Sequence, residues 1–342
     1  MSSDALSSAS PGGLARPAAD TPAAKVWHAP DTRRALQLAL AFIWLLDAIL
    51  QFQSFMFTTA FSKMLADTAS GNPRVIADPI TWSARIIGEH PGSTNAAFAT
   101  IQLLLGLGIA WRPTVKAALA ASVAWSLGVW WLGEGLGGVL DGAANPVNGA
   151  PGAVILYALL AVLLWPAREL DPVPTAAAAG RSARFVAARP VGALPARILW
   201  LVLWGSLAYF AVVPSTGADG LHDMISGMEG SNPGWLNSLL RVGASAVAGH
   251  GDTVSAILAV LLGIVAVGIF LPAPTVRAVL VLAVVVSLAI WVFGEALGAI
   301  FSGQGTDVNT GPLLILIAAA YWPLRQRGAA PPAALTGEVE EG

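Results

Sequence analysis

Eight apolar runs of helical length alternate with short polar segments along most of the chain. As a helix, each run can cross about 30 Å of hydrocarbon, although the shorter ones need help from flanking residues. The pattern predicts an all-α fold, a polytopic transmembrane helical bundle of about eight spans. The expected spans are 35–57, 96–111, 115–140 and 153–165, followed by 198–213, 254–271, 276–301 and 312–322.

The second half of the chain repeats the pattern of the first. The sequence WWLGEGLG at 130–137 returns as WVFGEALG at 291–298, an offset of 161 residues, and the loop that follows returns with it. In that loop, Asn148 and Pro151 match Asn309 and Pro312. Each unit has an even number of spans, so the two copies have the same orientation. The sequence therefore predicts two parallel four-helix repeats related by an axis along the membrane normal.

The positions of Lys and Arg predict the topology. Most of them lie in the termini or in connections on one side of the expected spans, which places both termini in the cytoplasm of a multi-pass protein of the inner cell membrane. The expected organisation is a disordered cytoplasmic tail (1–32), a first membrane repeat (33–166), a cytoplasmic linker (167–195), a second repeat (196–323) and a cytoplasmic tail (324–342). Each repeat has a long outward connection with an amphipathic helix, at 78–89 and 235–248.

The composition supports this membrane class. The chain is 56% hydrophobic and 11% charged, too few charges to cover a soluble globule. The bilayer is therefore its first partner. A net charge of −2 argues against a nucleic-acid partner, and the absence of cysteine excludes disulfides, thiol exchange and cysteine-ligated clusters.

The four-span units, the long connection after the first span and the phrase WLLDAILQ at 44–51 resemble the DoxX/DoxD-like membrane family. The resemblance covers nearly all of both halves as architecture. It implies a quinone-linked redox role or an accessory role in a membrane complex, with a redox partner. This chain differs from the simple family pattern because it is a tandem of two units.

Glu134 and Glu295 are the first candidates for chemistry, as ligand or proton groups. Glu134 lies 18 residues after Lys116, about 27 Å along a helix, so both carboxylates belong near the outer edge of the hydrocarbon. An anion in the last turns of a helix opposes the helix dipole, so each glutamate should have a basic partner. The charge-partner candidates on the outer side are Arg85, His90, Arg241 and His250. A structural clasp and a proton, ion or substrate site both remain open.

Asp47 is the second candidate, because an acid at membrane depth is costly unless it is paired or protonated. Gln51 lies one turn further out and Ser54 two turns, a polar track that predicts an outward-opening cavity. The matching positions in the second half are Leu207 and Ala211. The alternative is a core hydrogen bond from Asp47 to Gln51 or Gln102.

No cofactor or metal site is evident. A quinone is implied by the family resemblance alone, haem is not expected because the chain has few histidines, and no catalytic residues are predicted. Three functions remain open: a DoxX-like redox or accessory subunit, a carrier that binds a small-molecule ligand or ion between its repeats, and a structural scaffold.

Overall fold

The computed structural model describes residues 32–166, 185–213 and 217–324, and within these ranges the chain is helical and has no strand. The all-α prediction is confirmed. The first half holds α1 (Thr32–Leu50), α2 (Thr59–Asp67), α3 (Arg74–Glu89), α4 (Pro91–Ala110), α5 (Val115–Leu132) and α6 (Ala153–Leu163). The second half holds α7 (Ala188–Val191), α8 (Ala193–Phe210), α9 (Gly220–Gly227), α10 (Gly234–Val247), α11 (Gly251–Gly268), α12 (Ala273–Ala289) and α13 (Thr310–Ala320).

Five helices of the described chain are long and apolar enough to cross a membrane: Pro91–Ala110, Arg112–Leu132, Ala193–Phe210, Gly251–Gly268 and Pro274–Gly294. The helix α1 has 19 residues but carries Arg33, Arg34 and Asp47. The helices α6 and α13 have 11 residues each. The structure therefore supports a membrane protein, while the count of eight spans stays a prediction.

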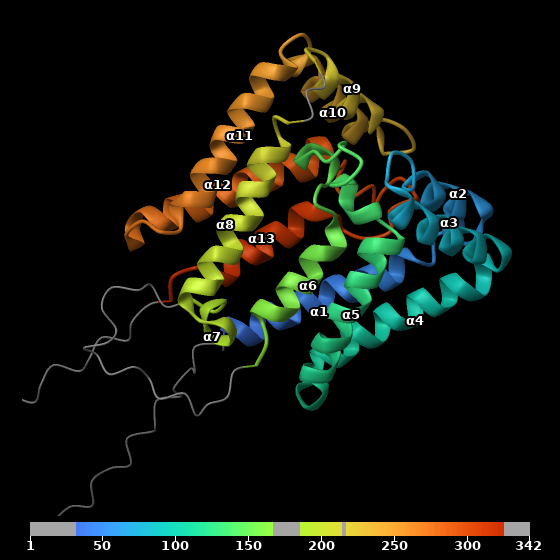
Figure 1. Ribbon diagram of the computed structural model, residues 1–342, viewed down its shortest axis with the longest axis horizontal. Helices are drawn as coiled ribbons and strands as arrows, with labels where there is room; N and C mark the ends of the chain where they lie inside the picture. Colours follow the sequence, from blue (N-terminus) through green and yellow to red (C-terminus); the bar gives the residue numbers. More distant parts are fainter. Residues whose placement is uncertain (1–31, 167–184, 214–216, 325–342) are drawn as a thin grey trace, which may run out of the picture.

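The two outward connections fold as pairs of short helices. The predicted amphipathic helices are present as α3 and α10, and each follows a helix that was not predicted, α2 and α9 respectively. Each pair has its own small apolar core, formed around Phe61 and Ile87 in one pair and around Ile225 and Leu240 in the other. Figure 1 shows the pairs at two separate corners of the molecule, α9 and α10 at the top and α2 and α3 at the right.

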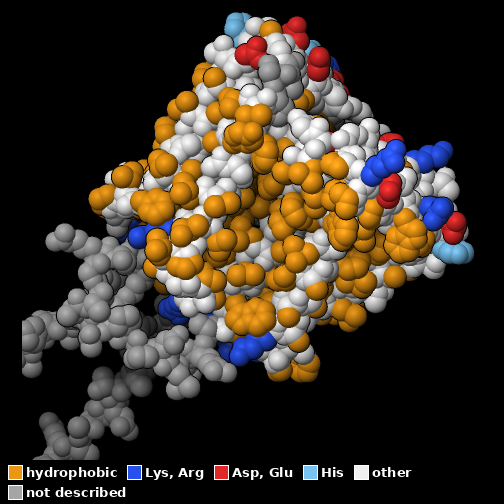
Figure 2. Space-filling view, in the orientation of Figure 1, with side chains coloured by type: hydrophobic (Ala, Val, Ile, Leu, Met, Phe, Trp, Pro, Cys, Tyr) orange, Lys and Arg blue, Asp and Glu red, His pale blue; other side chains and the backbone are white. Residues whose placement is uncertain are grey.

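The central core joins the two halves. Trp200, Trp204, Tyr157 and Tyr321 are its largest fully buried side chains, and the rings of Trp200 and Tyr321 lie 4.7 Å apart. Figure 2 shows hydrophobic side chains across the body of one face, whereas charged side chains gather at its edges. This distribution suits a helical bundle in lipid, where the apolar surface faces the hydrocarbon.

The expected linker 167–195 is not exposed throughout. Phe185, Val186 and Ala187 are buried, and the ring of Phe185 stacks on Tyr321 at 5.1 Å. The N–H of Ala187 donates a hydrogen bond to the carbonyl of Ala320 at 3.0 Å. The prediction of an exposed linker is wrong for this end, because a Phe-Val pair buries apolar area against the core. Residues 167–184 and most of both predicted tails lie outside the described residues.

Candidate functional site

The chain reverses direction directly after α5. The sequence predicts a span that continues to residue 140, but α5 ends at Leu132, and Leu136 (φ 58°) and Gly137 (φ 64°) have left-handed backbone conformations. A β-carbon at Gly137 would lie 2.0 Å from the carbonyl oxygen of Pro151. Gly137 therefore lets the loop 133–152 fold back beside the end of α5.

This reversal brings Glu134 to the beginning of α6. Its two carboxylate oxygens accept hydrogen bonds from the backbone N–H of Val154 at 3.2 and 3.3 Å. The indole N–H of Trp130 donates to the carbonyl of Pro151 at 2.7 Å and holds the same loop end. The first N–H groups of a helix have no partner within the helix and carry partial positive charge. They therefore supply the compensation that a carboxylate at the end of α5 requires.

Glu295 has the same kind of position after α12. Here a π-helical turn, η5 (Ile290–Gly294), precedes the glutamate. Its carboxylate accepts from the N–H and hydroxyl of Thr310 and from the N–H of Gly311 at 3.1 Å. The indole N–H of Trp291 donates to the carbonyl of Val308 at 2.9 Å. Both glutamates thus anchor the start of the next helix.

The two loops differ in length, which changes the match between them. The glutamate and the helix N–H that it binds are 20 residues apart in the first loop and 16 in the second. The carbonyl that accepts from the tryptophan belongs to Pro151 in one loop and to Val308 in the other. The structural counterpart of Pro151 is therefore Val308, and the match of Pro151 with Pro312 by residue letters does not hold.

Neither glutamate forms an ion pair with a predicted basic partner among the described residues. Arg85, His90, Arg241 and His250 are all exposed. Arg241 pairs with Glu229 at 3.0 Å, the one ion pair among the described residues, and the ring Nδ1 of His250 lies 2.9 Å from the carbonyl oxygen of Ala248. The glutamates need no basic side chain because helix N–H groups already bind them.

Asp47 on α1 also has a different partner from the one expected. Its side chain is 1% exposed, and its Oδ2 accepts a hydrogen bond from the hydroxyl of Tyr157 on α6, not from Gln51 or Gln102. The backbone N–H of Val308 also contacts this carboxylate. Asp47 therefore joins the first half to the loop 295–309 of the second. Tyr157 was missed, although a hydroxyl in the apolar run 153–165 was a visible signal.

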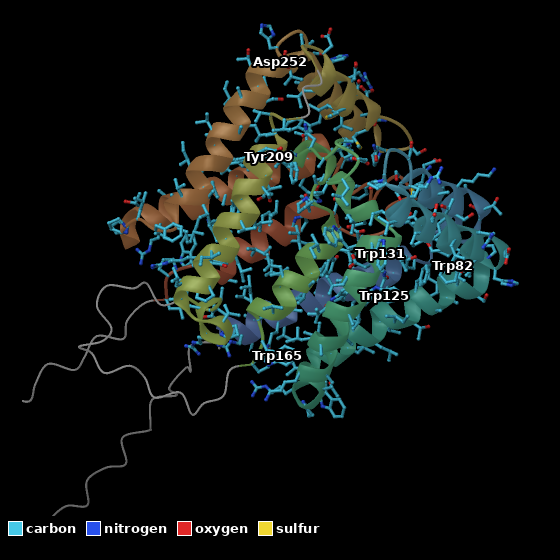
Figure 3. All side chains as sticks on the ribbon, in the orientation of Figure 1. Trp82, Trp125, Trp131, Trp165, Tyr209 and Asp252 are labelled. Atoms are coloured by element: carbon cyan, nitrogen blue, oxygen red, sulfur yellow. The ribbon has the colours of Figure 1, made fainter. Side chains whose placement is uncertain are left out.

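A cavity of about 420 Å³ lies beside Asp47, enclosed mainly by α1, α2, α4 and α5. Asp47, Gln51 and Glu134 line it, whereas Ser54 does not. Thr306 and Asp307 close it from the second half. Most of the wall is apolar, with five aromatic side chains: Trp44, Phe61, Phe98, Trp125 and Tyr157. Figure 3 labels Trp125 on α5, and its ring meets that of Phe98 edge to face at 5.5 Å.

A second, more polar cavity of about 270 Å³ adjoins the first. The loops 133–152 and 295–309 line it together, through groups such as Asn148, Gln304 and Asn309. The two cavities share four lining residues: Met64, Glu134, Thr306 and Asp307. Glu134 and Asp307 therefore lie where the larger, apolar cavity (the chamber) meets the smaller, polar cavity (the polar mouth).

Asp307 was not predicted, because it lies in a polar loop where an acid is unremarkable. Its Oδ1 accepts from the N–H of Asn309 at 2.6 Å, and its Oδ2 accepts from the hydroxyl of Thr306 at 2.9 Å. Burial nevertheless raises the pKa of Asp307 above its ordinary value. It lies within electrostatic range of Asp47, Glu134 and Tyr157.

The cavity wall has an excess of hydrogen-bond acceptors. No Lys, Arg or His is among the described residues that line either cavity. Asp47 Oδ1, Gln51 Oε1 and Gln102 Oε1 are buried and lack a hydrogen-bond partner within the described part of the chain. An unsatisfied buried acceptor costs free energy, so this arrangement favours a ligand that donates hydrogen bonds.

The described residues contain no group of three or more His, Asp or Glu side chains that could hold a metal ion. Comparison of the chain with protein-family models, with curated proteins and with solved structures finds no match.

Proposed function

We propose that this chain is a multi-pass membrane carrier that binds one small organic molecule between its two halves. The observation that carries the proposal is the 420 Å³ cavity, which helices of the first half and Asp307 of the second half enclose together. Ligand sites in membrane carriers built from repeats characteristically lie at such interfaces. In this proposal the halves are parallel four-helix repeats with cytoplasmic termini, and the polar mouth faces outward.

The other two functions explain the cavity less well. A structural scaffold gains nothing from a chamber of this size, because a void in a core costs stability. A quinone, which the proposed DoxX/DoxD-like relationship would suggest, presents carbonyl oxygens that accept hydrogen bonds. The unpaired buried oxygens of Asp47, Gln51 and Gln102 are acceptors as well. The polarity of the wall therefore favours a carrier of donor ligands over a quinone site.

The test uses the space in front of Gly128. This residue lines the cavity, and a β-carbon there would meet no neighbouring atom within 4 Å. Gly128→Leu should therefore fold normally, because leucine has a higher helix propensity than glycine. The leucine side chain would then occupy the chamber. Gly205 on α8 also has open space around it and lies outside both cavities. Gly205→Leu is the matched control.

The measurement is native mass spectrometry of each protein purified in lipid nanodiscs, followed by uptake of the retained small molecule into proteoliposomes. We expect the unaltered protein and Gly205→Leu to retain and transport it, and Gly128→Leu to do neither. Equal retention by all three proteins, or no retained molecule and no transport by the unaltered protein, would contradict the proposal.

A further inference from the structure

The electrostatics of the cavity restrict its ligand, if the proposed function holds. We infer that the ligand is an organic cation, an ammonium group attached to an apolar body that contains a ring. Asp47, Glu134 and Asp307 bring three acidic groups to one chamber, and no basic side chain lines it among the described residues. A negatively charged ligand would add a further like charge in a setting of low dielectric constant, which is strongly unfavourable.

The hydrogen-bond pattern points to the same ligand class. The hydroxyl of Tyr157 already donates a hydrogen bond to Asp47, and the side-chain amide of Gln51 donates one to the carbonyl of Thr306 at 3.3 Å. The second carboxylate oxygen of Asp47 and the side-chain oxygen of Gln51 remain buried without a partner in the described chain. An ammonium group has up to three N–H donors and no acceptor, so it complements these oxygens as well as the carboxylates.

The rest of the wall suits an apolar ring. Trp44, Phe61, Phe98 and Trp125 line the same chamber as the carboxylates. Aromatic faces attract cations within about 6 Å and pack well against other rings. A polyhydroxylated or peptide-like ligand would leave polar groups against these rings without partners. The ligand therefore has two parts, a charged end near Glu134 and Asp307 and a ring-containing body between α4 and α5.

The experiment compares two probes with the same biphenylmethyl body and different head groups, the charged biphenyl-4-methylammonium and the neutral biphenyl-4-methanol. Binding to the full-length protein in nanodiscs is measured by titration calorimetry at pH 7. We expect the ammonium probe to bind about tenfold more tightly than the alcohol, the scale of one desolvated ion pair. Asp307→Asn should remove most of this preference.

Asp252→Asn is the control for loss of one negative charge. Asp252 is exposed on α11, and Figure 3 labels it far from Trp125 of the cavity. This variant should keep the full preference. Thermal unfolding of each variant shows whether it is folded, and Glu134→Gln replaces Asp307→Asn if the latter is not.

The outcomes separate this inference from the proposed function. If Gly128→Leu weakens binding of both probes but the unaltered protein does not prefer the ammonium, the cavity is a ligand site and the cation inference is wrong. If the preference persists in Asp307→Asn, or Asp252→Asn loses it equally, the inference is wrong as well. If neither probe binds the unaltered protein at millimolar concentration, the proposed ligand cavity itself is contradicted.

Discussion

The ends of α5 and α12 are related in sequence and have the same local structure, yet their surroundings differ. In both, a glutamate binds the first N–H groups of the following helix and a tryptophan holds the loop that leads into it. Glu295 is 2% exposed and has three donors, whereas Glu134 is partly exposed and lines both cavities.

The helices beside these two sites differ in the same direction. In the first half, α1 contributes Asp47 and Gln51 to a cavity wall. The sequence matches in α8 are Leu207 and Ala211, which are 1% and 2% exposed and belong to the packed core. In the second half the anchoring glutamate, Glu295, lies beside a packed core, whereas in the first half Glu134 lies beside a cavity. The contacts common to both glutamates are therefore those that the local structure requires, and the polar groups found in the first half alone are the candidates for binding a ligand.

The largest expected effect comes from giving the second half the acid of the first. Leu207→Asp places a carboxyl group in an apolar core with no counterpart of Tyr157 prepared for it. We expect a loss of about 4 kcal/mol in unfolding free energy, because an unpaired buried charge is strongly destabilising. SDS-induced unfolding in mixed micelles measures this loss. Asp47→Asn keeps shape and an acceptor for Tyr157, so it should lose less than about 1 kcal/mol. Similar losses in both variants would break the comparison.

Removal of each anchoring glutamate in turn sharpens the comparison between the ends of α5 and α12. Glu295→Ala leaves the hydroxyl of Thr310 and two helix N–H groups without their acceptor. A hydrogen bond to a charged group contributes about 1.5–3 kcal/mol, and other acceptors or water partly replace the lost carboxylate. The unfolding free energy should therefore fall by about 3 kcal/mol. Glu134→Ala leaves the first N–H groups of α6 at the edge of a cavity that water can enter, and should cost about half as much. The same micelle titration measures both. A larger loss in Glu134→Ala would show that the first site is the more structural one.

The third effect is a pH dependence confined to the first site. An ordinary Asp side chain titrates near pH 4. Burial raises the pKa of Asp307, so on acidification this residue takes up its proton at a higher pH than an ordinary Asp. Affinity for biphenyl-4-methylammonium should therefore fall as the pH is lowered toward that raised pKa. The titratable neighbours of Asp307 are Asp47, Glu134, Tyr157 and Glu295. Calorimetry at several pH values tests this.

The stability of the ligand-free protein should change with pH in the opposite direction from the affinity for the probe. A carboxyl with a raised folded-state pKa holds its proton more tightly in the folded protein, so the ligand-free protein should lose stability as the pH rises from the unfolded value near 4 through the raised folded-state pKa. Asp307→Asn should reduce the pH dependence of both binding and stability. An unchanged binding profile in Asp307→Asn would assign the pH dependence to another group.

The smallest effect concerns a single hydrogen bond. The indole N–H of Trp44 donates to the hydroxyl of Ser122 at 3.2 Å, while the indole nitrogen of Trp204 is buried without a partner in the described chain. The residue that matches Ser122 is Ala283, which is fully buried. Ala283→Ser should gain about 0.6 kcal/mol and Ser122→Ala should lose a similar amount, the average for such bonds between membrane helices. A loss in Ala283→Ser would show that the site has no room for a hydroxyl.

Much of the helical architecture could be predicted because apolar length and the positions of charges are properties of the sequence itself. The amphipathic helices α3 and α10, and the choice of Asp47, Glu134 and Glu295 as candidate acids, follow from polar residues in apolar runs. The helices α2 and α9 were missed because their polar and apolar residues alternate too briefly to stand out within long connections.

The partners of the acids could not be predicted for a physical reason. The N–H groups at the start of α6 and α13 are backbone donors, so no residue type announces them, and basic side chains were chosen in their place. Asp307 has no acidic counterpart in the first half, where Ala150 stands at the position that the structure matches to it. Its place in the cavity wall beside Asp47 follows only from the packing of the two halves.

The contact between Gln51 and Thr306 joins residues 255 positions apart, and Gln53 reaches Gly305 in the same way. The ribosome makes the acid of α1 early and the loop that covers it near the end of synthesis. A nascent chain that has not yet reached Thr306 therefore holds Asp47 without the backbone of Val308, in an open chamber. The site is complete only after residue 308 has been made, so a chain released before that point would have the helices of the chamber without its closing loop.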